Sequence, residues 1–241
     1  MAVVGIGPGA LEHITLKAKQ EIENAEVIVG YKKYVDLVRP LISKDAEIIV
    51  SEMGQEIERA EIAIIKALEN KRVAFVSGGD PGVYGAAGLV LEVAGNKKAD
   101  IDIEIVPGVT SATAAASSLG APLMVDFAVI SLSDILTPWE LIERRLRAAV
   151  DADFVIVLYN PQSEERKEPL LKTHKILLEY RNPKTLVGIV RRAKRHGEEI
   201  IITTLGEMLN YKIDMVTTII IGNSTTYLSN NRLITPRGYI F

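Results

Sequence analysis

The sequence of 241 residues contains no cysteine. Disulfide bonds and thiolate metal ligands are therefore excluded, and the composition is compatible with the reducing cytoplasm, where we expect the protein. The three histidines, at positions 13, 174 and 196, are scattered along the chain. Since zinc sites gather several ligands at close spacings, we expect no metal site.

Aromatic residues are also scarce, at 5%, so the core must consist mainly of Ile, Val, Leu and Ala. The net charge of −3 provides no overall positive field, and we expect no nucleic-acid partner. No segment offers the roughly 20 uninterrupted apolar residues that a membrane helix needs, and no membrane partner is expected.

Short β-branched runs alternate with longer stretches of helical periodicity, a pattern typical of α/β units on a largely parallel sheet. The pattern is interrupted near Gly120 to Leu123 and then resumes. We therefore predict two α/β domains, 1–121 and 122–241, with a cofactor cleft between them. Thr15 and Thr137 are predicted to cap helices, with Pro138 at the first position of the second one.

A glycine-rich loop, Gly5 to Ala10, follows the first predicted strand and matches the dinucleotide fingerprint G-x-G-x-x-G/A. Two features disfavour that interpretation. Pro8 removes a backbone donor, and the next helix is expected to begin only after Thr15. The glycines could instead permit a tightly packed turn or a backbone platform beside a flat ligand.

Two further loops follow predicted strands at the edge where open α/β sheets bind ligands. The loop 77–85 is dense in glycine and carries one carboxylate, Asp80, which could either close a turn or contact a ligand. The loop 106–111 ends in the hydroxyls of Thr110 and Ser111, which could cap the next helix or bind a polar group.

Taken in order, these loops resemble the tetrapyrrole methyltransferase family of cobalamin and sirohaem synthesis. The matching segments are GIGPG (5–9), SGGDPGVYG (77–85), VPGVTSATAAA (106–116), ISLSD (130–134) and LYNP (158–161). The resemblance implies S-adenosyl-L-methionine as methyl donor, S-adenosyl-L-homocysteine as its product and a tetrapyrrole as substrate.

Other segments resemble one subgroup of that family, which methylates C17 of precorrin-3B or of its cobalt-containing counterpart and contracts the ring. These segments are VGYKKYVDLV (29–38), SEMGQEIERA (51–60), DFAVISLSDILTPWELIERRL (126–146), LYNPQSEER (158–166), TTIIIGNSTT (217–226) and ITPRGY (234–239). Whether the substrate carries cobalt is left open by the sequence.

The resemblance implies a cofactor site made largely of backbone groups and hydroxyls. Its expected residues are Pro8, Asp80, Val83, Thr110, Ser111, Asn160, Arg191, Arg192, Ala193, Val216 and Thr217. For the substrate, the expected contacts are Gly5, Gly7, Gly9, Glu52, Met53, Tyr84, Ser131, Ser133 and Asp134.

Methyl transfer from a sulfonium requires mainly alignment of the reacting atoms. Ring contraction also moves a proton, for which Asp80 and Tyr84 are the favoured catalytic candidates, followed by Glu52 and Asp134. The substrate's acetate and propionate arms suggest a cationic rim, and Arg191 and Arg192 are better placed for it than the clusters at 144–147 and 166–167. Relatives are homodimers, so we expect a homodimer here.

Three alternatives compete with this interpretation. Another tetrapyrrole methyltransferase would share the fold but act on a different ring. A nicotinamide-dependent oxidoreductase would use the first glycine loop, and a non-catalytic carrier would bind a tetrapyrrole without transferring a methyl group.

Overall fold

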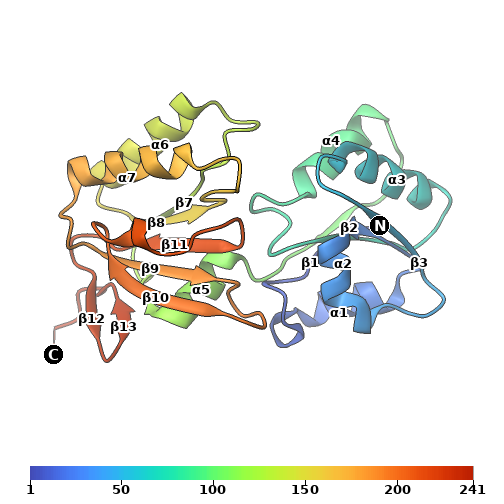
Figure 1. Cartoon of the computed structure of the whole chain (residues 1–241). Helices are drawn as coiled ribbons and strands as arrows, with labels where there is room; N and C mark the ends of the chain where they lie inside the picture. The colour runs from blue at the N-terminus through green and yellow to red at the C-terminus, as the bar shows by residue number, and fades with distance from the viewer. Residues whose placement is uncertain (241) are drawn as a thin grey trace. The chain divides into compact units, whose positions relative to one another are not determined.

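The computed structural model describes residues 1–240, which form two compact units (Figure 1). Met1–Thr110 form the first unit, and the described residues from Ser111 to 240 form the second. This division places the helix after Thr110 in the second unit, whereas the sequence predicts a boundary after Ala121. The boundaries 1–121 and 122–241 stay a prediction.

The first unit is built on a five-stranded sheet, all of whose neighbouring strands are parallel, in the order β3-β2-β4-β1-β5. The strands are β1 (Ala2–Gly5), β2 (Val27–Tyr31), β3 (Glu47–Ser51), β4 (Val73–Ser77) and β5 (Glu104–Val106). Because all strands run the same way, the loops that follow them meet at one edge of the sheet.

Helices cover both faces of this sheet, as Figure 1 shows. They are α1 (Leu16–Asn24), α2 (Lys32–Val38), α3 (Glu56–Leu68) and α4 (Ala87–Asn96), with 3-10 turns at Leu11–His13 and Arg39–Leu41. Side chains alternate along β1: Val4 joins the core with α1 and α2, whereas Val3 joins the core with α3 and α4. The segment α2 was not expected from the sequence.

The second unit has a mixed five-stranded sheet in the order β10-β9-β11-β8-β7. Its strands are β7 (Phe127–Ser131), β8 (Val155–Tyr159), β9 (Leu186–Arg191), β10 (Glu199–Thr204) and β11 (Thr217–Ile221). Only β7 and β8 pair in parallel; the other three pairs are antiparallel. The α/β class is confirmed, but the largely parallel arrangement is confined to the first unit.

The spacing of β9 and β10 explains this difference. The seven residues 192–198 separate them, which is too short for the crossover of a dozen or more residues that a parallel connection requires. The two strands therefore pair as an antiparallel hairpin. The alternation read from the sequence predicts the strands here, but not their direction.

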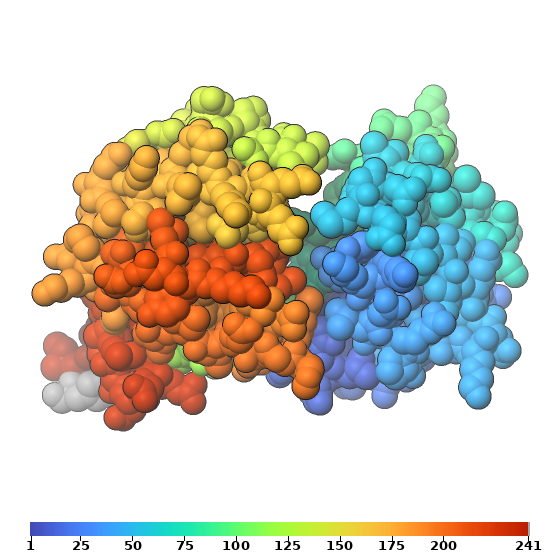
Figure 2. Space-filling model, viewed as in Figure 1, coloured from blue at the N-terminus to red at the C-terminus, as the bar shows by residue number. Residues whose placement is uncertain are grey.

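Helices α6 (Trp139–Asp151) and α7 (Glu168–Tyr180) cover one face of this sheet, and α5 (Ser111–Leu119) covers the other (Figure 1). Gly188 of β9 makes room for α5, because a Cβ at this position would overlap the Leu119 side chain. Figure 2 shows atoms of α7, in gold to orange, at the surface of the molecule. The Leu171 side chain of this helix is half-exposed.

A small third sheet joins β6 (Gly120–Ala121) to the hairpin of β12 (Tyr227–Ser229) and β13 (Arg232–Ile234). The two residues between β12 and β13, Asn230 and Asn231, have φ angles of 47° and 56°. Such left-handed pairs suit a type I′ hairpin turn, for which asparagine is favoured. This hairpin was not expected from the sequence.

The two predicted helix caps have different outcomes. The Thr15 hydroxyl accepts a hydrogen bond from the Ala18 backbone N–H at 3.1 Å, so this cap is confirmed. At α6 the prediction was wrong by one residue. Pro138 has an extended backbone, with ψ of 141°, and is itself the cap residue, without a side-chain hydrogen bond.

Candidate active site

In the first unit, the loops after β1 and β4 are joined by main-chain hydrogen bonds. Gly7 and Gly79 form a reciprocal pair, with N–H to O distances of 3.1 and 2.8 Å. The Ile6 N–H donates to the Ser77 carbonyl at 3.0 Å. The two predicted glycine loops therefore form one continuous backbone surface at the carboxyl edge of the sheet.

Close contact between loops explains two of the glycines. A Cβ added to Gly5 would lie 2.8 Å from the Gly79 carbonyl oxygen and 2.8 Å from the Gly108 nitrogen. A Cβ on Gly108 would overlap the Gly79 carbonyl oxygen and lie 2.8 Å from the Gly5 carbonyl carbon. Such distances exclude any side chain, so the three loops can pack only backbone against backbone.

The point at which helix α1 begins bears on the dinucleotide interpretation. Helix α1 begins at Leu16, beyond the 3-10 turn Leu11–His13, and not at the glycine loop. The loop therefore does not present a helix N-terminus to a pyrophosphate, which the fingerprint requires. The geometry favours the tightly packed turn among the alternatives left open by the sequence.

Asp80 connects two of the three loops. Its Oδ1 accepts a hydrogen bond from the Gly82 N–H at 2.8 Å, and its Oδ2 accepts one from the Gly108 N–H at 3.0 Å. Hydrogen bonds between a carboxylate and backbone N–H groups are charge-assisted and stronger than neutral ones. The Asp80 carboxylate thus fixes the loop after β4 against the loop after β5.

Other predicted residues of the first unit lie around this junction. Pro8 is buried, Val83 and Thr110 are partly buried, and the Tyr84 side chain is 57% exposed. Tyr84 has a φ of 52°, a left-handed conformation that is uncommon for a bulky residue. Left-handed residues of this kind concentrate at functional sites, where the surrounding structure maintains them.

Glu52 and Met53 lie at the same edge but farther along the sheet. They follow β3, which β2 and β4 separate from β1. Both residues are exposed, with the Met53 side chain 67% accessible. The structure therefore does not bring them into the junction of the three glycine loops.

In the second unit, the predicted residues also gather at one edge of a sheet. Ser131 and Asn160 end or follow the parallel strands β7 and β8. Thr217 begins β11, which runs antiparallel to β8, and it pairs with Arg191 at the end of β9. The pairing of β8 with β11 thus brings Asn160 and Thr217, which are far apart in the sequence, to the same edge of the sheet.

A hydrogen bond links the first two of these residues. The Asn160 Nδ2 donates to the Ser131 Oγ at 3.0 Å, and that hydroxyl also accepts from the Ser133 N–H at 3.3 Å. Asn160 has a left-handed backbone, with a φ of 50°, which asparagine adopts more readily than most residues. Ser131, Ser133 and Asn160 are therefore held together.

Arg166 is the residue at this edge whose role the sequence did not reveal. Its guanidinium donates to the Leu132 carbonyl at 2.6 Å and to the Asn160 carbonyl at 2.8 Å. Its Nε lies 3.8 Å from an oxygen of Asp134, and only 14% of the side chain is exposed. The sequence showed only a local basic pair at 166–167, because these acceptors are backbone carbonyls, which occur at every position.

A compact turn precedes β11 and is centred on Asp214. The Asp214 Oδ1 accepts hydrogen bonds from the Val216 N–H at 3.1 Å and from the Thr217 hydroxyl at 2.9 Å. The Arg191 Nε donates to the other oxygen, Oδ2, at 2.6 Å. Partial burial acts to raise the pKa of Asp214, but these hydrogen bonds outweigh it and lower the pKa below its ordinary value.

Arg191 is fully engaged in this arrangement. In addition to Asp214, it contacts Glu199 through Nη1 at 2.7 Å, and only 11% of its side chain is exposed. The hydrogen bond to Asp214 is the largest cause that raises the pKa of Arg191, and the hydrogen bond to Glu199 raises it further. Its guanidinium therefore has two carboxylate partners within the chain.

The next two residues differ from Arg191. The Arg192 side chain is exposed, and its backbone has a φ of 54°, while its N–H donates to the Val216 carbonyl at 2.9 Å. Ala193 is buried. Two arginines were expected at a cationic rim. The Arg192 side chain is exposed, whereas the Arg191 guanidinium is already paired with Asp214 and Glu199.

The start of α5 has a partner that the sequence did not suggest. The Tyr159 hydroxyl accepts a hydrogen bond from the Ala112 backbone N–H at 2.6 Å. The first N–H groups of a helix have no partner within the helix, so the phenol satisfies one of them. Ser111, a predicted cofactor residue, is thereby placed beside the carboxyl end of β8.

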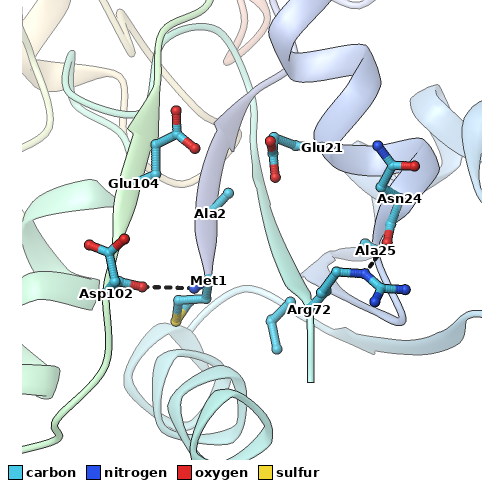
Figure 3. A pocket seen from close by; sticks show the side chains of 9 residues that line it. Met1, Ala2, Glu21, Asn24, Ala25, Arg72, Asp102 and Glu104 are labelled. Carbon is cyan, nitrogen blue, oxygen red and sulfur yellow. Dashed lines mark hydrogen bonds between the residues drawn. The ribbon is translucent and has the colours of Figure 1, made fainter. Parts of the chain in front are cut away.

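A pocket in the first unit lies at the opposite edge of the sheet, where β1, β4 and β5 begin and α1 ends (Figure 3). The Met1 ammonium group donates to the Asp102 carbonyl at 2.7 Å, and the Arg72 Nε donates to the Asn24 carbonyl at 2.9 Å. None of the predicted site residues lines this pocket.

Residues 1–240 contain neither a metal-binding cluster nor a membrane-spanning helix. Within that range, no group of three or more His, Asp or Glu side chains is arranged to hold a metal ion. Over the same residues, no helix combines the length and the hydropathy needed to cross a membrane.

The geometry of both edges can be compared with known proteins. Residues 1–209 match the family model described as Tetrapyrrole (Corrin/Porphyrin) Methylases. The chain belongs to this family. The predicted α/β class and the predicted methyltransferase family are thereby confirmed.

Two relatives show where this chain lies within the family. The cobalt-factor III methyltransferase of Priestia megaterium is 46% identical over 99% of this chain, which spans 45% of the length of that relative. The probable cobalt-factor III C(17)-methyltransferase of Salmonella typhimurium is also 46% identical, over 99% of both chains. This chain thus spans about half of one relative and almost all of the other.

A solved structure supports the same assignment. The crystal structure of the methyltransferase CobJ matches with a TM-score of 0.91 and 34% identity, covering 98% of each chain. The resemblance therefore extends over nearly the whole length of both chains.

The residues at these edges suit the methyl donor that the family implies. A sulfonium nucleoside is a cation with polar hydroxyl and amino groups, for which carbonyl oxygens, hydroxyls and a carboxylate are suitable partners. The backbone of the packed glycine loops, the Asp80 carboxylate and the hydroxyls of Thr110 and Ser111 provide these groups. Residues with a side chain at positions 5 and 108 could not form the same surface, because a Cβ there would come too close to the backbone of the neighbouring loops.

Proposed function

We propose that this protein transfers a methyl group from S-adenosyl-L-methionine to C17 of a cobalt-factor III type tetrapyrrole in cobalamin biosynthesis. The observation that carries the proposal is the 46% identity to a probable cobalt-factor III C(17)-methyltransferase over 99% of both chains. The second relative at 46% identity also has cobalt-factor III in its name. Their names favour the cobalt-containing substrate over precorrin-3B, a choice that the sequence alone left open.

The proposed cofactor contacts are the predicted ones, with roles adjusted to the geometry. Main-chain groups of the packed loops, together with Asp80 and Thr110, contact the cofactor from the first unit. In the second unit, Asn160 and the turn that begins β11 contribute backbone groups. Arg191 acts by holding Asp214, because its guanidinium is already bonded to two carboxylates. The full set remains Pro8, Asp80, Val83, Thr110, Ser111, Asn160, Arg191, Arg192, Ala193, Val216 and Thr217.

For the substrate, we propose contacts from the loops that carry Tyr84, Ser131, Ser133 and Asp134, and from the exposed Glu52 and Met53. The glycine backbone at positions 5, 7 and 9 forms the surface beside the ring. The cationic contact to a substrate carboxylate is assigned to Arg192, whose side chain is exposed.

The chemical step requires little of the protein beyond alignment. The substrate carbon forms a bond to the methyl carbon while the methyl–sulfur bond breaks, and the bonding electrons remain on sulfur. Holding the two reactants in line contributes ~7–11 kcal/mol in favourable cases. Rigid backbone loops fixed by Asp80 and by the Asn160–Ser131 hydrogen bond suit such a task.

Ring contraction and the associated proton transfer are part of the proposal. Both oxygens of Asp80 already accept backbone hydrogen bonds, and the Tyr84 side chain is more exposed than the Asp80 carboxylate. Tyr84 is therefore our first candidate for the group that moves a proton, with Asp80 second.

Mass spectrometry of reaction products tests the proposal. The purified protein is supplied with S-adenosyl-L-methionine and, in parallel, with cobalt-factor III or metal-free precorrin-3B. We expect one added methyl group on the cobalt-containing ring and formation of S-adenosyl-L-homocysteine. Efficient turnover of precorrin-3B alone would contradict the substrate assignment and leave the methyltransferase assignment intact.

The competing functions give different results in the same assays. An oxidoreductase would be stabilised against thermal unfolding by NAD and not by S-adenosyl-L-homocysteine. A carrier would bind the tetrapyrrole without forming S-adenosyl-L-homocysteine. A methyltransferase for another ring would methylate uroporphyrinogen or a different corrin precursor in preference to cobalt-factor III.

We also propose that the protein works in the cytoplasm as a homodimer. The exposed Ile135 and Leu136, 77% and 95% accessible, are apolar residues suited to burial against a second copy. Sedimentation at micromolar concentration tests the assembly, and a monomer there would contradict it.

A further inference from the structure

The second unit contains an arginine that joins the loops of the candidate site. Arg166 donates from Nη1 to the Leu132 carbonyl at 2.6 Å and from Nη2 to the Asn160 carbonyl at 2.8 Å. Nη2 also lies 3.6 Å from the Met215 sulfur. The loops that follow β7 and β8 and the turn that precedes β11 therefore meet at one guanidinium.

The segment that carries Arg166 is itself folded into a defined turn. The Ser163 hydroxyl accepts from the Arg166 N–H at 3.1 Å, and the Ser163 N–H donates to the Arg166 carbonyl at 3.0 Å. The neighbouring Gln162 donates to the Ile213 carbonyl at 2.8 Å. The segment 162–166 is thus held in place by these hydrogen bonds, and its guanidinium donates to the loops that follow β7 and β8.

The carbonyl groups that Arg166 holds belong to functional segments. Leu132 lies between Ser131 and Ser133, and Asn160 donates its amide to the Ser131 hydroxyl at 3.0 Å. Asp134 lies 3.8 Å from the Arg166 Nε. Every polar residue that we assign to the site after β7 and β8 is therefore a direct partner of Arg166 or lies next to one in the chain.

The geometry points to Arg166 as a positioning residue for the reaction, acting through the loops 131–134 and 158–161. This inference rests on the proposed function for its catalytic consequence. A planar guanidinium can donate in several fixed directions at once, whereas a lysine ammonium acts as a point charge. The arrangement therefore requires the fork of arginine and not only a positive charge.

The test compares Arg166→Lys and Arg166→Gln with a matched control, Arg147→Lys. Arg147 also makes two short contacts, to Glu143 at 2.9 Å and to Glu179 at 2.6 Å, but it joins α6 to α7. Losing the contacts of Arg147 should affect stability without affecting the site loops. Melting temperatures of all variants show how much each substitution destabilises the fold.

Hydrogen–deuterium exchange of the full chain gives a measurement that needs no ligand. We expect both Arg166 variants to accelerate exchange in peptides covering 131–134 and 158–161 by about tenfold or more, the factor for losing one charge-assisted hydrogen bond. Arg147→Lys should leave these peptides unchanged. Equal exchange in Arg166→Lys and the unsubstituted protein would overturn the inference.

Binding and kinetics then test the catalytic consequence. We expect Arg166→Lys to raise the Kd for S-adenosyl-L-homocysteine and the KM for the tetrapyrrole by about tenfold, and Arg147→Lys to leave both unchanged. Full rescue by lysine would show that only the charge counts and would overturn the inference. If the unsubstituted protein neither binds the nucleoside nor methylates a tetrapyrrole, the proposed function fails, while exchange still decides whether Arg166 holds the loops.

Discussion

The Asp80 carboxylate accepts a hydrogen bond from the Gly108 backbone N–H at 3.0 Å, across 28 positions of sequence. Its other oxygen accepts from Gly82 at 2.8 Å. Asp80 therefore stabilises the junction of the loops after β4 and β5, whatever it contributes to chemistry. A residue with two backbone donors has less freedom to approach a substrate than an unattached carboxylate.

Replacing Asp80 with Asn separates these roles. The amide keeps one acceptor oxygen but places an NH2 group against a backbone N–H, leaving that donor without a partner. We expect a loss of ~1–3 kcal/mol in the free energy of unfolding, together with weaker binding of S-adenosyl-L-homocysteine. Urea denaturation and calorimetry measure the two effects.

The contrary outcome for Asp80→Asn is also informative. If stability and nucleoside binding were unchanged while turnover was lost, the carboxylate would act on the substrate itself. Such a result would favour Asp80 over Tyr84 as the proton-transfer group.

Gly108→Ala tests the close packing of the three loops. The added methyl group would overlap the Gly79 carbonyl oxygen and lie 2.8 Å from the Gly5 carbonyl carbon, so the backbone must shift. We expect a destabilisation of ~1–3 kcal/mol, the usual range for overpacking, measured by chemical denaturation.

A matched control for this substitution lies in the same unit. Gly88 is in helix α4, and a Cβ there would meet nothing within 4 Å. Gly88→Ala should therefore stabilise the protein by ~0.5–1 kcal/mol, because alanine loses less conformational entropy in a helix. Equal effects of the two substitutions would contradict the packing account.

These loops also show how far the sequence could lead. The order of the glycine motifs and their place after strands were readable, because strand and loop composition is local. The contacts of Gly5 with Gly108 depend on β5 lying beside β1, which no local pattern specifies. The sequence therefore predicted that these glycine loops follow strands of the sheet, but left open whether their glycines serve packing or a ligand.

In the second unit, local patterns in the sequence predicted less of the candidate site. Asn160 and Thr217 were expected at the site only through resemblance, and the structure shows that antiparallel pairing of β8 and β11 places them at one edge. Arg166 and Tyr159 were missed because their partners are backbone groups of Leu132, Asn160 and Ala112. Backbone acceptors and donors occur at every position, so they leave no signal in a sequence.

The Asp214 turn predicts a dependence of stability on pH. The folded protein holds the pKa of Asp214 below its ordinary value, so the charged form stabilises the fold above the unfolded pKa. This stabilisation is lost as the pH falls through the lowered pKa. Asp214→Asn should therefore lower the melting temperature at pH 7 and have a progressively smaller effect below about pH 4.

Thermal unfolding across a pH series measures this difference. Asp36→Asn is a suitable control, since Asp36 lies on α2 and has no ion pair among residues 1–240. A constant difference between Asp214→Asn and the unsubstituted protein from pH 7 to pH 3 would refute the assigned role of the carboxylate.

The two adjacent arginines at the end of β9 should behave differently when replaced by glutamine. Arg191 is bonded to Asp214 and Glu199, so Arg191→Gln leaves a partly buried carboxylate without its cation and should lower the melting temperature. Arg192 is exposed, and Arg192→Gln should leave the melting temperature nearly unchanged.

If Arg192 contacts a substrate carboxylate, its replacement should raise the KM for the tetrapyrrole by about tenfold, the factor for one charge-assisted hydrogen bond. The Kd for S-adenosyl-L-homocysteine, which lacks the tetrapyrrole's carboxylate arms, should change much less. An unchanged KM in Arg192→Gln would remove this residue from the substrate site, and the cationic contact would then have to come from another part of the chain.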